Sequence, residues 1–218
     1  MVDVFYVETR KKIDSLNLSV LDSILGKTIS LAATVQYLDI LPTVQRYLEK
    51  RGHNVVVKDG AYYKGHVVGC QAQAFDLDSD DFLLLCDGSF HGLNNALLIN
   101  KEINVFNGES LIKIEQKDLD KYYKEIKLKQ NKFLINNKVG LLISNKMGQK
   151  SLSSDIVKNN IEKLGKKLYI FECDNVDIGE FENFNDIKIF VNTACFGLGI
   201  DDKRIINLHD IIEFLKWT

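Results

Sequence analysis

An internal repeat constrains the fold of this chain more than any other feature of its sequence. Lys27–Val57 and Lys138–Phe171 share one pattern: a short apolar run, a polar loop, an amphipathic stretch, a glycine and a second apolar run. The matched positions of Val44–Gly52 recur 113 residues later in Val157–Gly165. We therefore expect two copies of one structural unit.

Each copy is predicted to form a strand, a helix and a second, parallel strand. Continuous apolar runs are typical of strands buried on both faces of a parallel sheet. A glycine that follows an amphipathic stretch is typical of a helix end, since glycine adopts the left-handed conformation easily. The predicted strands of the repeat are Thr28–Ala33, Asn54–Val57, Val139–Ile143 and Lys167–Glu172, and the predicted helices are about Asp39–Arg51 and Ser154–Leu164.

Further apolar runs extend both sheets. The additional predicted strands are Phe82–Cys86 and Ile187–Val191, with His66–Val68 and Ile103–Phe106 as shorter candidates, and the predicted closing helix is Leu208–Trp217. The expected fold class is α/β, with two related small domains that have parallel sheets of four-stranded type flanked by helices.

A lysine-rich stretch separates the two copies. Gln116–Asn131 has an apolar stripe at helical spacing and is predicted to form a helical bridge. Its lysines are expected to form a solvated face: Lys117, Lys121, Lys124, Lys127 and Lys129. The predicted domains are 1–112 and 137–218, joined by the bridge at 113–136.

The head of the chain lies outside the repeat. Val2–Glu8 has the β-branched and aromatic content of a strand. It is interpreted either as an edge strand of the first domain or as the last strand of a missing preceding domain.

Composition and charge exclude several classes of function. The 218 residues carry a net charge of -2, so no general basic field attracts nucleic acid. No apolar run approaches the roughly 18 residues that a membrane span needs. Met1–Arg10 lacks the pattern of a signal peptide, which predicts a cytoplasmic protein with reduced cysteines. Gly197-Leu-Gly199 is only a fragment of a dinucleotide-binding motif, and a P-loop is absent.

Polar loops follow the predicted strands, where ligands of open α/β sheets bind. These loops contain two of the four cysteines, Cys70 and Cys195. A buried core position is the default for a reduced cysteine, with a reactive thiol or a metal ligand as the alternatives. Taken alone, these residues indicate a two-domain α/β protein that binds a small molecule.

Five loop strings together resemble a known family, the radical enzymes of diphthamide synthesis, 2-(3-amino-3-carboxypropyl)histidine synthases. Asn192-Thr-Ala-Cys195 followed by Ile200-Asp-Asp202 is the most specific match. The other strings are Ala33-Thr-Val-Gln36, Val68-Gly-Cys-Gln71, Asp87-Gly-Ser-Phe-His91 and Ser144-Asn-Lys-Met-Gly-Gln149.

The resemblance implies a 4Fe-4S enzyme that acts on S-adenosylmethionine. In this family three related α/β domains each give one cysteine to a central cluster, which leaves one iron open to the substrate. A 3-amino-3-carboxypropyl radical is transferred to a histidine of translation elongation factor 2. The implied cofactors are therefore the cluster and S-adenosylmethionine, and the implied partner is the elongation factor.

The resemblance assigns roles to residues of this chain. Cys70 matches the cluster ligand of the middle domain, and Cys195 matches that of the last domain. His91 is expected to orient the substrate or to donate a hydrogen bond to a cluster sulfur, and is the predicted catalytic residue. The residues expected to bind the methionine moiety of the cofactor are Gln36, Ser144, Lys146 and Gln149. The alternative for each of these loop residues is a helix cap or a turn.

The resemblance covers the middle and last domains and skips the first, together with its cysteine. One interpretation is a split enzyme, in which a second chain supplies the first domain and the third cysteine. Another is a non-catalytic partner of a complete, homologous subunit. In the third, Cys86 or Cys173 replaces the missing ligand. Phe196 and Gly197 follow Cys195, where the family has a proline and a basic residue.

Overall fold

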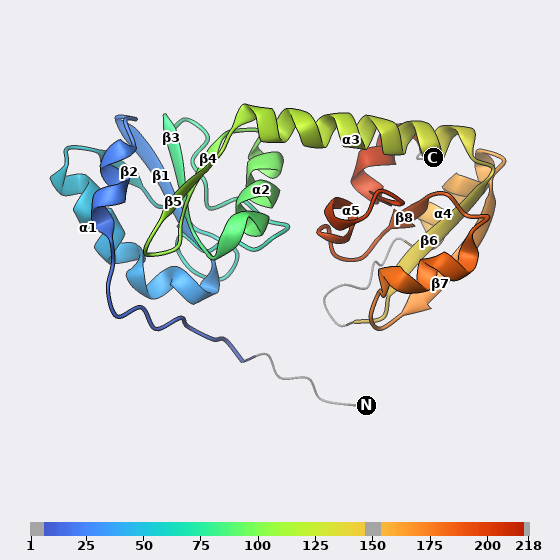
Figure 1. Ribbon diagram of the computed structural model, residues 1–218, viewed down its shortest axis with the longest axis horizontal. Helices are drawn as coiled ribbons and strands as arrows, with labels where there is room; N and C mark the ends of the chain where they lie inside the picture. Colours follow the sequence, from blue (N-terminus) through green and yellow to red (C-terminus); the bar gives the residue numbers. More distant parts are fainter. Residues whose placement is uncertain (1–6, 147–153, 216–218) are drawn as a thin grey trace. The chain divides into compact units, whose positions relative to one another are not determined.

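The computed structural model describes residues 7–146 and 154–215. The chain forms two compact units, Met1–Leu119 and Asp120–Thr218, and the boundary lies within helix α3 (Gln116–Ile135). None of the helices in the described residues has both the length and the apolar character for a membrane span. Figure 1 traces the elements in chain order.

The first unit contains a five-stranded sheet in the order β2-β1-β3-β4-β5. Its first four strands are parallel, and β5 pairs with β4 in the antiparallel sense. The strands are β1 (Thr28–Ala33), β2 (Asn54–Val56), β3 (Asp81–Leu85), β4 (Ile103–Phe106) and β5 (Leu111–Ile114). The helices are α1 (Leu41–Lys50) and α2 (Gly88–Ile99), with the 3₁₀ helices η1 (Leu18–Ser23) and η2 (Val35–Ile40).

The second unit contains a four-stranded, fully parallel sheet in the order β7-β6-β8-β9. The strands are β6 (Lys138–Ser144), β7 (Lys167–Cys173), β8 (Phe190–Asn192) and β9 (Ile205–Asn207). The helices are α4 (Ser154–Lys163) and α5 (Leu198–Asp201), with the 3₁₀ helices η3 (Ile178–Phe184) and η4 (Leu208–Phe214). The second, first, third and fourth strands of each unit lie in that order, so the predicted α/β class and the repeated topology are confirmed.

The repeat in the sequence is also a repeat in packing. Val44 of α1 and Val157 of α4 are both fully buried against their own sheets. Gly52 and Gly165 end the two segments with φ of 90° and 74°, the left-handed conformation that favours glycine.

Both faces of the first sheet are covered. Along β3, Leu83 and Leu85 enter one core cluster, and Phe82 and Leu84 enter another, because successive side chains of a strand point to opposite faces. Helix α1 packs in the first cluster and α2 in the second, and Figure 1 shows the two helices on either side of the sheet. Burial on both faces explains why β3 has no polar alternation in its sequence.

Two predicted strands differ from the structure. His66–Val68 forms only a single parallel bridge, between His66 and Ala33, because the chain turns back at once between Val68 and Gln71. In the predicted strand Ile187–Val191, pairing with the neighbouring strand β6 begins only at Phe190. The strands β5 and β9 were not predicted.

Three other predictions differ from the structure or lie partly outside the described residues. The closing helix is a 3₁₀ helix that ends at Phe214, and Trp217 lies outside the described residues. The prediction that Lys129 is solvated is wrong, because its side chain is buried and donates to the backbone oxygen of Gly199. Of the predicted strand Val2–Glu8, residues 2–6 lie outside the described residues, and Val7 and Glu8 belong to no strand.

Candidate functional site

Cys70 lies on a tight turn at the carboxyl edge of the first sheet. Val68 and Gln71 close the turn with two backbone hydrogen bonds of 3.3 and 3.2 Å. The side chain of Cys70 is exposed. A Cβ atom at Gly69 would lie 3.7 Å from Nδ1 of His91, in ordinary contact, so the turn packs directly against α2. The structure therefore brings Cys70 and His91 to one place.

His91 is half-buried in the first turns of α2. Its Nδ1 is buried and has no hydrogen-bond partner among the described residues. Burial lowers the pKa of His91, so the imidazole is neutral at pH 7. The buried Oδ1 atoms of Asn94 and Asn95 also lack partners within the described part of the chain. A neutral imidazole beside other unsatisfied polar atoms can accept or donate one hydrogen bond to a group that enters this site.

A network that the sequence did not reveal lies beside α2. Nζ of Lys11 donates to Oδ1 of Asp87 at 2.8 Å and to the Tyr37 hydroxyl at 2.9 Å. The hydroxyl of Tyr37 also donates to Asp87. The Lys11 ammonium and the Tyr37 hydroxyl lower the pKa of Asp87, whereas burial and Asp87 raise the pKa of Tyr37 to about 12. The network fixes Asp87 immediately before α2 and ties the segment around Lys11 to the carboxyl edge.

Gln36 lies at the same edge. Its side chain is exposed in η2, and its backbone oxygen accepts a hydrogen bond of 2.9 Å from the Lys11 amide. The amide group of Gln36 is therefore accessible to a ligand.

Cys195 lies on a loop at the carboxyl edge of the second sheet. The loop is fixed by the buried side chain of Asn192, which donates to the Cys195 oxygen at 2.8 Å and accepts from the Ala194 amide at 2.9 Å. The hydroxyl of Thr193 donates to the oxygen of Leu142 at 2.8 Å. These bonds hold the backbone, while the Cys195 side chain is exposed.

A buried polar cluster supports this loop. Asn192 also donates to Oδ1 of Asn207 at 2.7 Å, and Asn207 packs against Gly199 so closely that a Cβ atom there would overlap its amide. Nζ of Lys129 binds the Gly199 oxygen, and burial lowers the pKa of this lysine. Only the polar loop after β8 was predicted from the sequence. The two supporting residues Lys129 and Asn207 were not.

The remaining predicted site residues follow β6. Ser144 is buried at the strand end, and its Oγ accepts a hydrogen bond of 3.2 Å from the Lys146 amide. Lys146 is exposed. Gln149 lies outside the described residues.

The four cysteines differ in their surroundings. Cys86 is fully buried at the end of β3, and burial raises its pKa to about 12. Cys173 is half-buried, and burial also raises its pKa. Cys70 and Cys195 are the exposed pair. Among residues 7–146 and 154–215, no three histidine, cysteine or acidic side chains are grouped so that they could hold a metal ion.

Fold and cysteines together define a class of protein: two α/β units of related topology, each with one exposed thiol on a loop at the carboxyl edge of its sheet. The chain belongs to the family described as diphthamide synthesis protein, which it matches over residues 1–205. It is also similar to subunit 1 of the 2-(3-amino-3-carboxypropyl)histidine synthase of Aspergillus fumigatus, with 24% identity over 183 residues. That match covers 81% of this chain and 41% of the fungal protein.

Solved structures share the fold. The crystal structure of Dph2 from Pyrococcus horikoshii matches with a TM-score of 0.78 and 22% identity, over 92% of this chain and 60% of that one. The structure of Dph2 from Pyrococcus horikoshii with a 4Fe-4S cluster matches with a TM-score of 0.77 and 22% identity, over 89% and 58%. The chain thus spans about three fifths of these structures and about two fifths of the fungal relative.

Proposed function

We propose that this chain is part of a 4Fe-4S enzyme for the first step of diphthamide synthesis, and that a separate chain completes its cluster site. The enzyme would transfer the 3-amino-3-carboxypropyl group of S-adenosylmethionine to a histidine of translation elongation factor 2 in the cytoplasm. The observation that carries the proposal is the division among the cysteines: the two that match family ligands, Cys70 and Cys195, are the two that expose their side chains.

The residues present fit two ligands of a cluster. Iron–sulfur clusters bind thiolates, and a thiol in contact with water loses its proton more readily than a buried one. Cys70 and Cys195 are exposed, so a cluster can reach both thiols, and both stand on backbone held by hydrogen bonds. Cys86 does not, because ionising its buried thiol is costly. This argues against Cys86 as the replacement ligand and favours a third cysteine from a partner.

The bound cluster would supply the single electron that breaks the sulfur–carbon bond of S-adenosylmethionine. Residues of this chain would hold the substrate. Lys146 offers an exposed ammonium to the methionine carboxylate, and the amide of Gln36 can donate to or accept from the same moiety. Ser144 supports the loop that carries Lys146, and Gln149 follows in the same family string. His91, neutral beside the Cys70 turn, would donate to or accept from a group at the cluster.

The first test is reconstitution with iron and sulfide under argon. The chain alone is expected to show no stable iron–sulfur absorption, because it supplies two ligands. A complex with a separate chain that consists of the family's first domain and its cysteine is expected to be brown. A colourless complex would contradict the proposal and would favour a non-catalytic partner.

The second test assigns the ligands. In that complex, Cys70→Ala and Cys195→Ala are each expected to abolish the brown colour and the transfer to the elongation factor. Cys173→Ala is the matched control, because Cys173 is also partly accessible but matches no family ligand. Loss of the cluster in the control with retention in the other two variants would refute the assignment.

The alternative is a partner subunit that positions a complete enzyme. One observation favours it: Phe196, which stands where the family has a proline, stacks on His209 with ring centroids 4.9 Å apart. An aromatic stack beside Cys195 gives this loop a different surface from the family pattern. If this alternative holds, Cys195→Ala will leave the transfer by the complex unchanged.

A further inference from the structure

A hollow in the second unit lies at the opposite edge of the sheet from Cys195. It has a volume of about 330 Å³. Asn136, Lys188 and Arg204 line it, and they come just before β6, β8 and β9. These three strands are parallel, so the residues that precede them gather at the amino edge, whereas the Cys195 loop follows β8 at the carboxyl edge. The hollow is therefore separate from the candidate cluster site.

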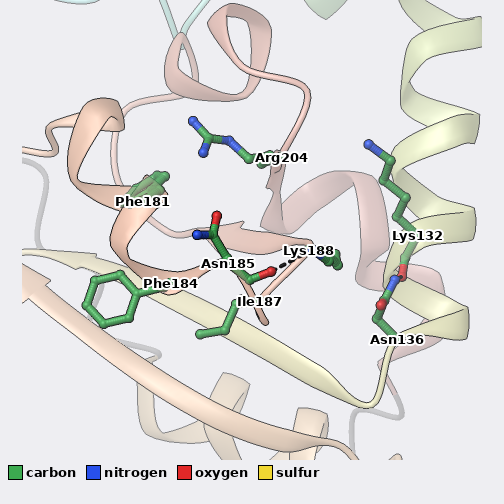
Figure 2. Close-up of a pocket in the computed structure, with 8 residues that line it drawn as sticks. All are labelled: Lys132, Asn136, Phe181, Phe184, Asn185, Ile187, Lys188 and Arg204. Carbon is green, nitrogen blue, oxygen red and sulfur yellow. Dashed lines mark hydrogen bonds between the residues drawn. The ribbon is translucent and has the colours of Figure 1, made fainter.

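One wall of the hollow is aromatic and held in place from behind. Phe181 stacks on Phe190 with centroids 4.3 Å apart and an angle of 14°. Phe184 packs edge-on against Phe171 at 4.8 Å and exposes 41% of its surface. Figure 2 shows Phe181 and Phe184 on one side and Ile187 between them and α3. Phe181 is itself only 6% exposed, so the accessible aromatic surface of this wall is that of Phe184.

The rim of the hollow is basic. Lys132, Lys188 and Arg204 line it, and no acidic residue does. Nζ of Lys132 and Nζ of Lys188 donate to backbone oxygens, those of Lys203 and Asn185. Neither ammonium has a carboxylate within 4.0 Å among the described residues. Two ammonium groups that have no carboxylate partner, beside an apolar wall, favour the binding of an anion.

Arg204 is oriented before any ligand binds. Asp202 accepts from its Nε at 3.2 Å and from its Nη2 at 2.9 Å, and the Ile178 oxygen accepts from Nη2 at 3.3 Å. The guanidinium carbon lies 5.9 Å from the centroid of the Phe181 ring. These contacts use Nε and Nη2, so Nη1 can donate to a further acceptor. Figure 2 shows Arg204 on the Phe181 side of the hollow and Lys132 on the α3 side.

We propose that this hollow binds a small anion that carries an aromatic ring. The ring lies against Phe184, the exposed aromatic side chain of the wall, and the charged group accepts hydrogen bonds from Lys132, Lys188 and Arg204. The volume is at the lower end of small-molecule sites, which are roughly 300–1,000 Å³. The charged group is a phosphate, as in a nucleoside monophosphate, or a carboxylate, as in an aryl acid. This site does not depend on the proposed function.

The test uses the full chain and the fluorescent probe anilinonaphthalene sulfonate, an aromatic anion. Saturable binding is expected, and Lys132→Gln with Lys188→Gln should weaken it about tenfold or more, since charge-assisted contacts are lost. Lys127→Gln is the matched control, because Lys127 is an exposed lysine on the same helix that does not line the hollow. A change of less than about twofold in the double variant would overturn the proposal.

Two competitors distinguish the sources of the charge, and a further variant tests the ring. Displacement of the probe by adenosine monophosphate identifies a phosphate site, and displacement by phenylacetate identifies a carboxylate site. If neutral adenosine displaced the probe as strongly as adenosine monophosphate does, the cations would play no part in binding. That result would overturn the proposal. Phe184→Leu keeps apolar bulk and is expected to weaken the binding of aromatic anions only, with a small fall in the urea midpoint because the edge-on contact with Phe171 is lost.

Discussion

Replacement of Gly199 by alanine tests how the Cys195 loop is held. Gly199 lies in α5, and its φ is not in the left-handed region. Helix propensity alone therefore predicts that alanine stabilises the protein by about 1 kcal/mol. The packing predicts the opposite, because the new Cβ atom would overlap the side-chain amide of Asn207. The two effects have opposite signs, so the measurement decides between them.

The expected cost follows from the contacts. Overpacking of a well-packed site costs about 1–3 kcal/mol. Displacement of Asn207 also weakens its buried hydrogen bond with Asn192, which contributes about 1 kcal/mol. We expect Gly199→Ala to lower the free energy of unfolding by about 2–4 kcal/mol. The atoms of Asn207 that the Cβ would meet all lie beyond its own Cβ, so Asn207→Ala removes the overlap.

The assay is urea unfolding followed by circular dichroism, with amide hydrogen exchange to assign the change to the second unit. Asn207→Ala alone should cost about 1–2 kcal/mol, and the double variant should cost little more. Gly69→Ala is the control, because the nearest atom to its Cβ would be 3.6 Å away, and should stay within about 0.5 kcal/mol of the wild type. Additive costs in the double variant, or stabilisation by Gly199→Ala, would refute the reasoning.

The cysteines and the Asp87 network give two further predictions. Iodoacetamide at neutral pH should modify Cys70 and Cys195 of the native chain well before Cys86, as measured by peptide mass spectrometry, and equal rates would contradict the assigned burial. Folding lowers the pKa of Asp87. The bond of Asp87 to Lys11 therefore stabilises the protein above the unfolded pKa of about 3.9, and this stabilisation is lost as the pH falls through the pKa of Asp87 in the folded state. Asp87→Asn should therefore be less stable at pH 7 and should lose less of its stability on acidification, and an acid profile parallel to that of the wild type would contradict this.

The apolar pattern was sufficient to predict the inner part of both sheets. Thr28–Ala33 and Ile103–Phe106 form strands with the predicted bounds, because their runs are buried on both faces and have no other stable arrangement. Short edge strands such as Ile205–Asn207 were missed, because three residues are too few to show a periodic apolar pattern. The 3₁₀ geometry at Leu208–Phe214 also has no distinct signature in the sequence.

The candidate site could also be predicted only in part from the sequence. Cys70 and Cys195 could be proposed because each stands in a loop string that resembles a family, and their exposure agrees with a ligand role. The residues that hold these loops could not be proposed, because their partners are distant in sequence. Lys11 binds Asp87 across 76 residues, and Lys129 binds Gly199 across 70.

Lys129 shows why a helical pattern alone is insufficient. Five lysines on one helix predict a solvated face, and four of them are exposed. The fifth is buried because the Gly199 carbonyl has no intrahelical partner in the short helix α5 and needs a donor. A buried ammonium is costly unless it is hydrogen-bonded, and the Gly199 oxygen supplies that bond. The same bond therefore stabilises the segment that follows Cys195, and this connects the packing of α3 to the position of the proposed cluster ligand.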